Sequence, residues 1–273
     1  RAAPPPHSYL TPRCCRPSGT LKSQMASRGG SAPSPDVLLV NQQSYIDILF
    51  LATKYTPTFA RVSQQGGLTR VSTLSALLHC FGAVAPAAPK EGSDESTLHT
   101  LEWARSTFAG PLVVFPEGAP TNGRGVLAFT PSAADLAKVV MRGAAGNCAV
   151  IKLLAITYPS KPDVQVPYIS GSPWQHALHL MGTLINNITT VELASGLDPQ
   201  PLDCLAAVED GSAPTEAQVE AAAADWSTLA QNTLANLIRG GCRAVPLTAA
   251  DHVSFLKFAA GDKSAQRRKR KVQ

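Results

Sequence analysis

The chain has 273 residues, of which 44% are hydrophobic and 16% charged, and this composition provides a sizeable core and excludes a disordered protein. Its formal net charge of +5 comes from the ends, because residues 1–35 carry five basic residues and no acid, and residues 267–271 carry five more. Removing these ten from the 24 basic residues leaves 14 against 19 acidic residues, and an acidic folded part argues against nucleic-acid binding.

Three parts are expected along the chain. Residues 1–35 form a flexible basic arm rich in Pro and Ser, residues 36–262 form the folded domain, and residues 263–273 form a basic tail. The Arg- and Ser-rich start also fits an organelle transit peptide, which leaves plastid targeting open. Because the chain begins with Arg1 and not with Met, we expect further sequence upstream.

Hydrophobic periodicity predicts strands that alternate with helices. Strands are predicted at 37–40, 58–62, 83–85, 111–115, 149–158, 164–169 and 190–193. Helices are predicted at 44–54, 68–81, 95–108, 132–142, 174–188 and 215–238. Because the strands are apolar throughout, the fold class expected is α/β, with a largely parallel central sheet covered by helices on both faces.

Neither a metal site nor a membrane span is expected. The six cysteines form no C-x-x-C pair and no zinc spacing, which favours a reduced compartment. No run approaches the roughly 18 consecutive apolar residues that cross a bilayer, so any membrane contact should be monotopic or lie outside this sequence.

Two polar segments follow predicted strands. NQQSYID occupies residues 41–47 after the strand 37–40, and FPEGAPTNGRG occupies residues 115–125 at the end of the strand 111–115. In open α/β sheets the ligand site lies outside the carboxyl ends of the strands. We therefore expect both segments to face one cleft.

The two segments resemble motifs of the phospholipid/glycerol acyltransferase family, the lysophosphatidic acid acyltransferases. The first family motif reads N-H-x-S-x-x-D and the third reads F-P-E-G-T-x-S/T-N. The number of residues between Asp47 and Glu117 is also about the same as between the corresponding positions in the family. The continuation through residues 122–125 is most similar to the fungal and algal lysophosphatidic acid:oleoyl-CoA acyltransferase branch. The resemblance covers roughly residues 37–195 and implies a glycerol-3-phosphate acyltransferase-like fold.

The resemblance also implies a reaction and its location. The reaction is transfer of an acyl group from acyl-CoA, a co-substrate and not a bound cofactor, to a lysophospholipid such as lysophosphatidic acid. The implied location is a membrane surface, on the cytosolic face of the endoplasmic reticulum or of lipid droplets. No nucleic-acid partner, bound cofactor or metal is expected.

The resemblance assigns roles to individual residues. The catalytic pair would be Asp47 and the residue at the motif His position, which here is Gln42. The residues implied in substrate binding lie in the same two segments: Asn41, Ser44, Phe115, Pro116, Glu117, Gly118, Asn122 and Arg124. Taken without the resemblance, Ser44-x-x-Asp47 has the form of a helix capping box, and the second segment is rich in turn formers.

Gln42 puts catalysis in question because an amide cannot hold a proton at physiological pH. Three explanations stay open. The chain is a silent lipid-binding pseudoenzyme; another group serves as base, such as His79, His99 or Asp47 acting through water; or the sequence is diverged or misread. The family's second block, with an acceptor-binding Arg, should fall near Gly82, where only Lys90 offers a displaced cation.

Features outside the motifs have two interpretations each. One set of apolar residues has helical spacing, which fits core packing or membrane docking: Trp174, Leu178, Met181, Leu184, Ile185 and Ile188. His176 and His179 lie three residues apart without a carboxylate or cysteine cluster and are expected at a surface or interface. The basic run 267–271 fits either anionic-lipid binding or a solvated end.

Overall fold

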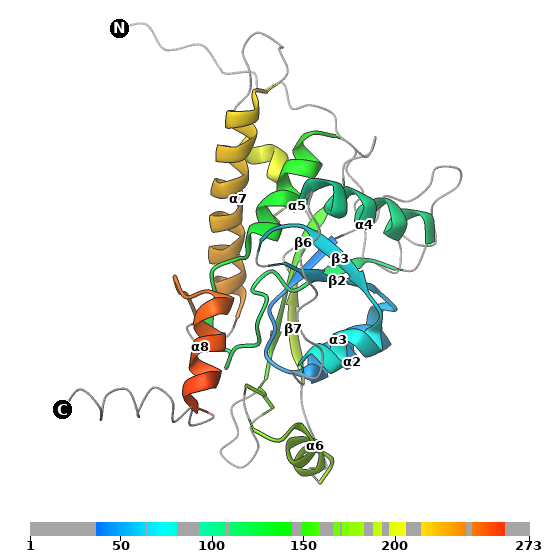
Figure 1. Ribbon diagram of the computed structural model, residues 1–273, viewed down its shortest axis with the longest axis vertical. Helices are drawn as coiled ribbons and strands as arrows, with labels where there is room; N and C mark the ends of the chain where they lie inside the picture. The colour runs from blue at the N-terminus through cyan, green and yellow to red at the C-terminus, as the bar shows by residue number, and fades with distance from the viewer. Residues whose placement is uncertain are drawn as a thin grey trace, which may run out of the picture. The chain divides into compact units, whose positions relative to one another are not determined.

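The strands of a six-stranded sheet have the order β3-β2-β4-β1-β6-β7. The sheet lies at the centre of the fold, between the helices (Figure 1). Its strands are β1 (Val37–Val40), β2 (Thr58–Val62), β3 (Leu68–Val71), β4 (Leu112–Val114), β6 (Ile151–Thr157) and β7 (Thr189–Glu192). Strands β2, β4, β1 and β6 pair in parallel, whereas β3 and β7 add antiparallel edges. The predicted α/β class with a largely parallel sheet is confirmed.

The computed structural model describes residues 37–63, 65–80, 93–107, 110–143, 149–158, 166–169, 171–182, 188–192, 197–205, 214–238 and 242–259. All of them lie within one unit, Pro33–Gln273. The predicted strand 83–85, Lys90 and the basic run 267–271 lie outside the described residues. The predicted boundaries of the arm, the domain and the tail stay predictions.

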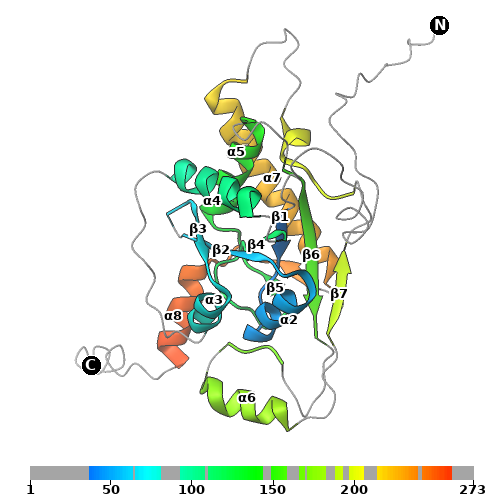
Figure 2. The ribbon, with the colours of Figure 1, turned by 90° about the vertical axis from the view of Figure 1, so that its right-hand side faces the viewer.

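Helices cover both faces of the sheet. They are α2 (Tyr45–Tyr55), α3 (Thr73–Cys80), α4 (Ser93–Thr107), α5 (Pro131–Met141), α6 (Pro173–Met181), α7 (Glu216–Leu237), α8 (Ala249–Ala259) and the short 3-10 helix η1 (Pro201–Cys204). Figure 2 shows α4 and α5 on one side of β2, and α2 and α3 on the other. The alternation of β1 explains both layers, because Val37 and Leu39 face one core while Leu38 and Val40 face the second.

The larger core is anchored by Trp226 of α7, which is fully buried. Its indole Nε1 donates a hydrogen bond to the Pro199 carbonyl oxygen at 2.9 Å, so the one polar atom of the side chain is satisfied. Around it lie small residues of the same helix, Ala222, Ala223 and Ala230, which bring α7 close to the sheet and to α5.

Several predicted elements differ from the structure. The predicted helix 68–81 is wrong at its start, because residues 68–71 form β3 and the helix begins at Thr73. Gly66 and Gly67 both have positive φ and make the turn that pairs β3 with β2. Residues 166–169 were expected in a strand but do not form one. The helix predicted at 174–188 ends at Met181. Helix α8 and the two-stranded sheet of β5 (Gly125–Val126) and β8 (Arg243–Ala244) were not predicted.

Within the described ranges, no helix combines the length and the apolar character that crossing a membrane requires.

Replacing Trp226 by Ala should destabilise the fold by about 3–5 kcal/mol, because it removes a large buried side chain and leaves a cavity. Trp174 is 77% exposed, and its replacement by Ala should change stability by less than about 0.5 kcal/mol. Urea unfolding of the two variants measures the difference. Equal losses in both would contradict the core placed around Trp226.

Candidate functional site

The segments after β1 and β4 meet because these strands are parallel neighbours, so their carboxyl ends lie at one edge of the sheet. The backbone N–H of Gln42 donates to Glu117 Oε1 at 3.2 Å, and the N–H of Thr121 donates to the Gln42 carbonyl oxygen at 2.8 Å. The structure thus joins residues 41–47 and 115–125 by direct hydrogen bonds.

Asp47 fastens the first segment. It is fully buried, and its Oδ2 accepts hydrogen bonds from the N–H groups of Gln43 at 2.6 Å and Ser44 at 2.8 Å. Its Oδ1 accepts a hydrogen bond from the hydroxyl of Tyr158, which follows β6. Burial raises the pKa of Asp47 to about 6, although these three hydrogen bonds favour the ionised form. Asp47 therefore caps α2, as the capping-box interpretation expects, and also ties α2 to the end of β6.

Glu117 fastens the second segment in a similar way. Its carboxylate is fully buried, with Oε1 accepting from Gln42 and Oε2 accepting from the N–H of Leu127 at 2.8 Å. Burial is the largest cause that raises the pKa of Glu117 to about 8, and the charge of Asp47 adds to it. This carboxyl group holds the turn 115–127 in place from the inside.

The side chain of Gln42 points to α3. Its Nε2 donates to the Cys80 Sγ at 2.9 Å, while Asp47 bonds to Tyr158. Burial and the nearby Asp47 raise the pKa of the Cys80 thiol to about 12, so this thiol is protonated at neutral pH and is not a nucleophile. The side chains of Gln42 and Asp47, the expected catalytic pair, thus have different hydrogen-bond partners.

Asn41 is bonded to the sheet. Its Nδ2 donates to the Ile156 carbonyl oxygen at 3.0 Å, and its Oδ1 accepts from the Ile156 N–H at 2.7 Å. The side chain of Asn41 therefore continues the pairing of β1 with β6 past the end of β1. The hydroxyl of the neighbouring Ser44 is buried and has no hydrogen-bond partner among the residues that the structure describes.

The other residues of the second segment divide into buried and exposed ones. Phe115 stacks on Phe59, and the Pro116 carbonyl oxygen accepts a hydrogen bond from the Thr130 N–H at 2.9 Å. Gly118 has φ +69°, and a Cβ there would lie 3.0 Å from the Thr130 Cγ2. Asn122 and Arg124 are exposed, and the Asn122 side chain accepts from the Arg124 N–H at 3.0 Å.

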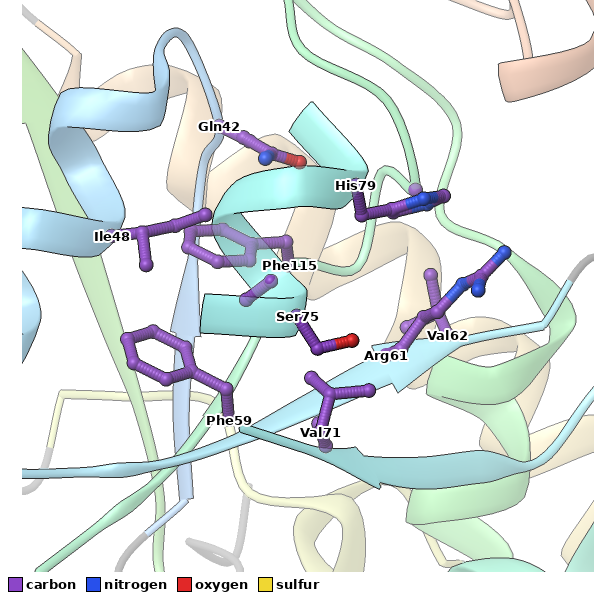
Figure 3. A pocket seen from close by; sticks show the side chains of 12 residues that line it. Gln42, Ile48, Phe59, Arg61, Val62, Val71, Ser75, His79 and Phe115 are labelled. Carbon is purple, nitrogen blue, oxygen red and sulfur yellow. The ribbon is translucent and has the colours of Figure 1, made fainter. Parts of the chain in front are cut away.

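A pocket opens beside Gln42 (Figure 3). Its walls are mainly apolar residues of α2, β2, β3, α3 and the end of β4: Ile48, Phe59, Ala60, Val62, Val71, Ala76, Phe115 and Gly118. Four polar side chains complete it: Gln42, Arg61, Ser75 and His79. An apolar pocket with a few polar groups is the usual form of a small-molecule site.

Arg61 and Ser75 are functional candidates that were not predicted from the sequence. The only signal in the sequence was a basic residue within the apolar strand of β2, TFARV. Of the two histidines proposed as replacement bases, His79 lines the pocket, whereas His99 is exposed on α4, across the sheet from α3. His176 packs against Tyr45 and Tyr168, and the described residues contain no cluster of three or more metal-ligating side chains.

The chain is thus an α/β protein with a candidate ligand site at the carboxyl ends of its parallel strands. Comparison with curated proteins shows which class of protein it resembles. A stretch of 104 residues, 38% of this chain, is 31% identical to a Schizosaccharomyces pombe protein provisionally named lysophosphatidic acid:oleoyl-CoA acyltransferase. A stretch covering 64% of the chain is 25% identical to the lysophospholipid acyltransferase LPEAT1 of Arabidopsis thaliana.

These similarities span only part of each relative, 34% of the yeast protein and 42% of the plant protein. No protein-family model matches the chain. The two relatives support a lysophospholipid acyltransferase family for this chain.

The buried Glu117 should make stability depend on pH. Its pKa rises from 4.5 to about 8 on folding, so between these values the folded state keeps a proton that the unfolded state has released. The contribution of Glu117 to the free energy of unfolding is therefore fully present below pH 4.5 and is lost as the pH rises towards 8. Replacing Glu117 by Gln should flatten the fall in unfolding free energy over this range.

Urea unfolding at a series of pH values measures this slope. The matched control is Glu102→Gln on the exposed side of α4, which should keep the wild-type slope. A Glu117→Gln variant with an unchanged slope would show that this carboxyl group does not hold the proton.

Proposed function

We propose that this chain transfers an acyl group from acyl-CoA to a lysophospholipid such as lysophosphatidic acid, on a fold of the glycerol-3-phosphate acyltransferase type. Both relatives bear names of acyltransferases that act on such lipids. The observation that carries the proposal is the hydrogen-bonded junction between Gln42 and Glu117 at the edge of an apolar pocket.

The pocket suits the substrates of this reaction. The stacked rings of Phe59 and Phe115 offer an apolar wall for an acyl chain, and the polar side chains offer partners for a glycerol headgroup. Gly118 lets the backbone come close to a ligand, because it lines the pocket and carries no Cβ. Arg124, exposed in the same segment, is proposed as a phosphate contact.

A silent lipid-binding protein on the same fold is the second candidate. It is favoured by Gln42, whose amide bonds to Cys80 and cannot accept a proton, and by Asp47, whose carboxylate bonds to Tyr158. A positioned base contributes about 10²- to 10⁴-fold to such a reaction, so its loss would leave little transfer.

An assay with labelled acyl-CoA and lysophosphatidic acid separates the two candidates. We expect wild type to transfer the label, and Asp47→Ala to lose most activity, because the capping carboxylate holds residues 43–47 at the pocket. The control is Asp203→Ala, which also removes a carboxylate from a helix N-terminus, at η1 away from the pocket. Transfer that appears only in Gln42→His would instead support the silent alternative.

Membrane association is proposed from an apolar face of α6. Trp174, Leu178 and Met181 lie on one side of this helix and are between 65% and 77% exposed, so core packing does not account for them. Leu180 is the buried residue of the helix. A bilayer surface fits such a face, since the proposed acceptor resides in membranes and the chain carries a basic run at residues 267–271. Endoplasmic reticulum or lipid droplets remain the proposed location.

Flotation with phosphatidylcholine vesicles containing phosphatidic acid tests this face. Leu178→Asp should reduce the bound fraction several-fold, because it places a charge in the apolar face. Leu229→Asp makes the same change at an exposed position of α7 and should bind like wild type. Equal binding of all three proteins would rule out α6 as the docking element.

A further inference from the structure

The proposed reaction requires a base that the motif residues do not supply. Gln42 cannot accept a proton. Asp47 and Glu117 are fully buried, neither lines the pocket, and all four of their carboxylate oxygens accept hydrogen bonds. Both carboxyl groups therefore fix the loops, and a base must come from another element.

His79 is the imidazole that lines the pocket. It lies in the last turn of α3 and shares the pocket with Gln42 and Gly118, one residue from each motif segment. The next residue, Cys80, accepts the hydrogen bond from Gln42, and this contact fixes the end of α3 beside the β1 loop. An imidazole can accept a proton and give it back, as the missing motif residue would.

Arg61 supplies a cation in the same pocket. It belongs to β2, is partly buried and lines the pocket together with His79. Figure 3 shows the His79 ring and the Arg61 guanidinium extending toward the same side of the pocket. Burial lowers the pKa of Arg61, but a guanidinium keeps its charge at neutral pH, and it can bind a phosphate through two parallel hydrogen bonds.

We infer that His79 is the general base of acyl transfer in this chain and that Arg61 binds the phosphate of the acceptor inside the pocket, in addition to the contact proposed for Arg124; this inference rests on the proposed function. His79 takes the proton of the acceptor hydroxyl while the oxygen attacks the thioester carbonyl carbon. A C–O bond forms, the C–S bond breaks, and the coenzyme A thiolate takes the proton back from the imidazolium. The products are an ester and a thiol, and nothing is oxidised or reduced.

The test compares two histidine variants of the full chain in the acyl-CoA and lysophosphatidic acid assay. His79→Ala should lower kcat by about 10²- to 10⁴-fold, while the KM for acyl-CoA stays close to wild type. Added imidazole should restore part of the lost rate, which a merely structural residue would not allow. His99→Ala, at an exposed position on α4, should keep wild-type kcat. Thermal unfolding checks that both variants fold.

Arg61 is tested with two acceptors. Arg61→Gln should raise the KM for lysophosphatidic acid at least tenfold and leave the KM for a monoacylglycerol, which has no phosphate, unchanged. Arg70→Gln on the neighbouring strand β3, where the guanidinium lies over the Trp103 ring, is the matched control. A KM that rises equally for both acceptors would overturn the phosphate assignment.

The outcomes separate the inference from the proposed function. If wild type transfers the acyl group and His79→Ala does so equally well, His79 is not the base, while acyl transfer stands. If wild type transfers nothing and Gln42→His does, the chain is a silent protein and both proposals fall. If His79→Ala is inactive but not rescued by imidazole, the base assignment is overturned as well.

Discussion

The arrangement of the site depends on one buried carboxylate. Asp47 binds the N–H groups that open α2 and the hydroxyl of Tyr158 beyond β6, so a single side chain fixes a helix to the ends of two strands. Removing a charged group from water is expensive, and only hydrogen bonds to both of its oxygens offset that cost. The position of Gln42, five residues earlier, follows from this bond network.

Glu117 repeats this arrangement on the next strand. A buried carboxyl group follows β1 and another follows β4, and both accept hydrogen bonds from backbone N–H groups. One of these N–H groups belongs to Gln42, which lies between the two carboxyl groups. These acidic side chains thus shape the pocket without lining it. Asp47 and Glu117 are therefore needed to hold the site together, but they are not placed to react with a ligand. Side chains that reach the pocket come instead from α3 and β2.

Much of this fold follows from the sequence, because continuous apolar runs such as Val37–Val40 mark buried parallel strands. The meeting of residues 41–47 with residues 115–125 could also be expected, because both segments follow strands that were predicted to be parallel. Strand β3 did not, because Leu68, Val71 and later apolar residues fit a helical period, and only the turn at Gly66 and Gly67 decides between the two.

Long-range contacts limited the prediction of the site. The pairing of Gln42 with Cys80 and of Asp47 with Tyr158 joins residues 38 and 111 positions apart, which no local pattern encodes. Arg61 and Ser75 enter the pocket for the same reason. The apolar spacing of α6 was visible in the sequence, but its exposure depends on what the rest of the chain leaves uncovered.

The strand order has a consequence for how the chain folds. Strand β4 lies between β1 and β2, although it follows both in the sequence, and β6 pairs with β1 across more than a hundred residues. During synthesis, β1 and β2 must therefore wait with unpaired edges until β4 inserts between them. Such non-local pairing is slow and exposes edges that aggregate. A ribosome-bound chain that ends before β6 would also lack Tyr158, so its β1 loop would be incomplete until most of the domain had emerged.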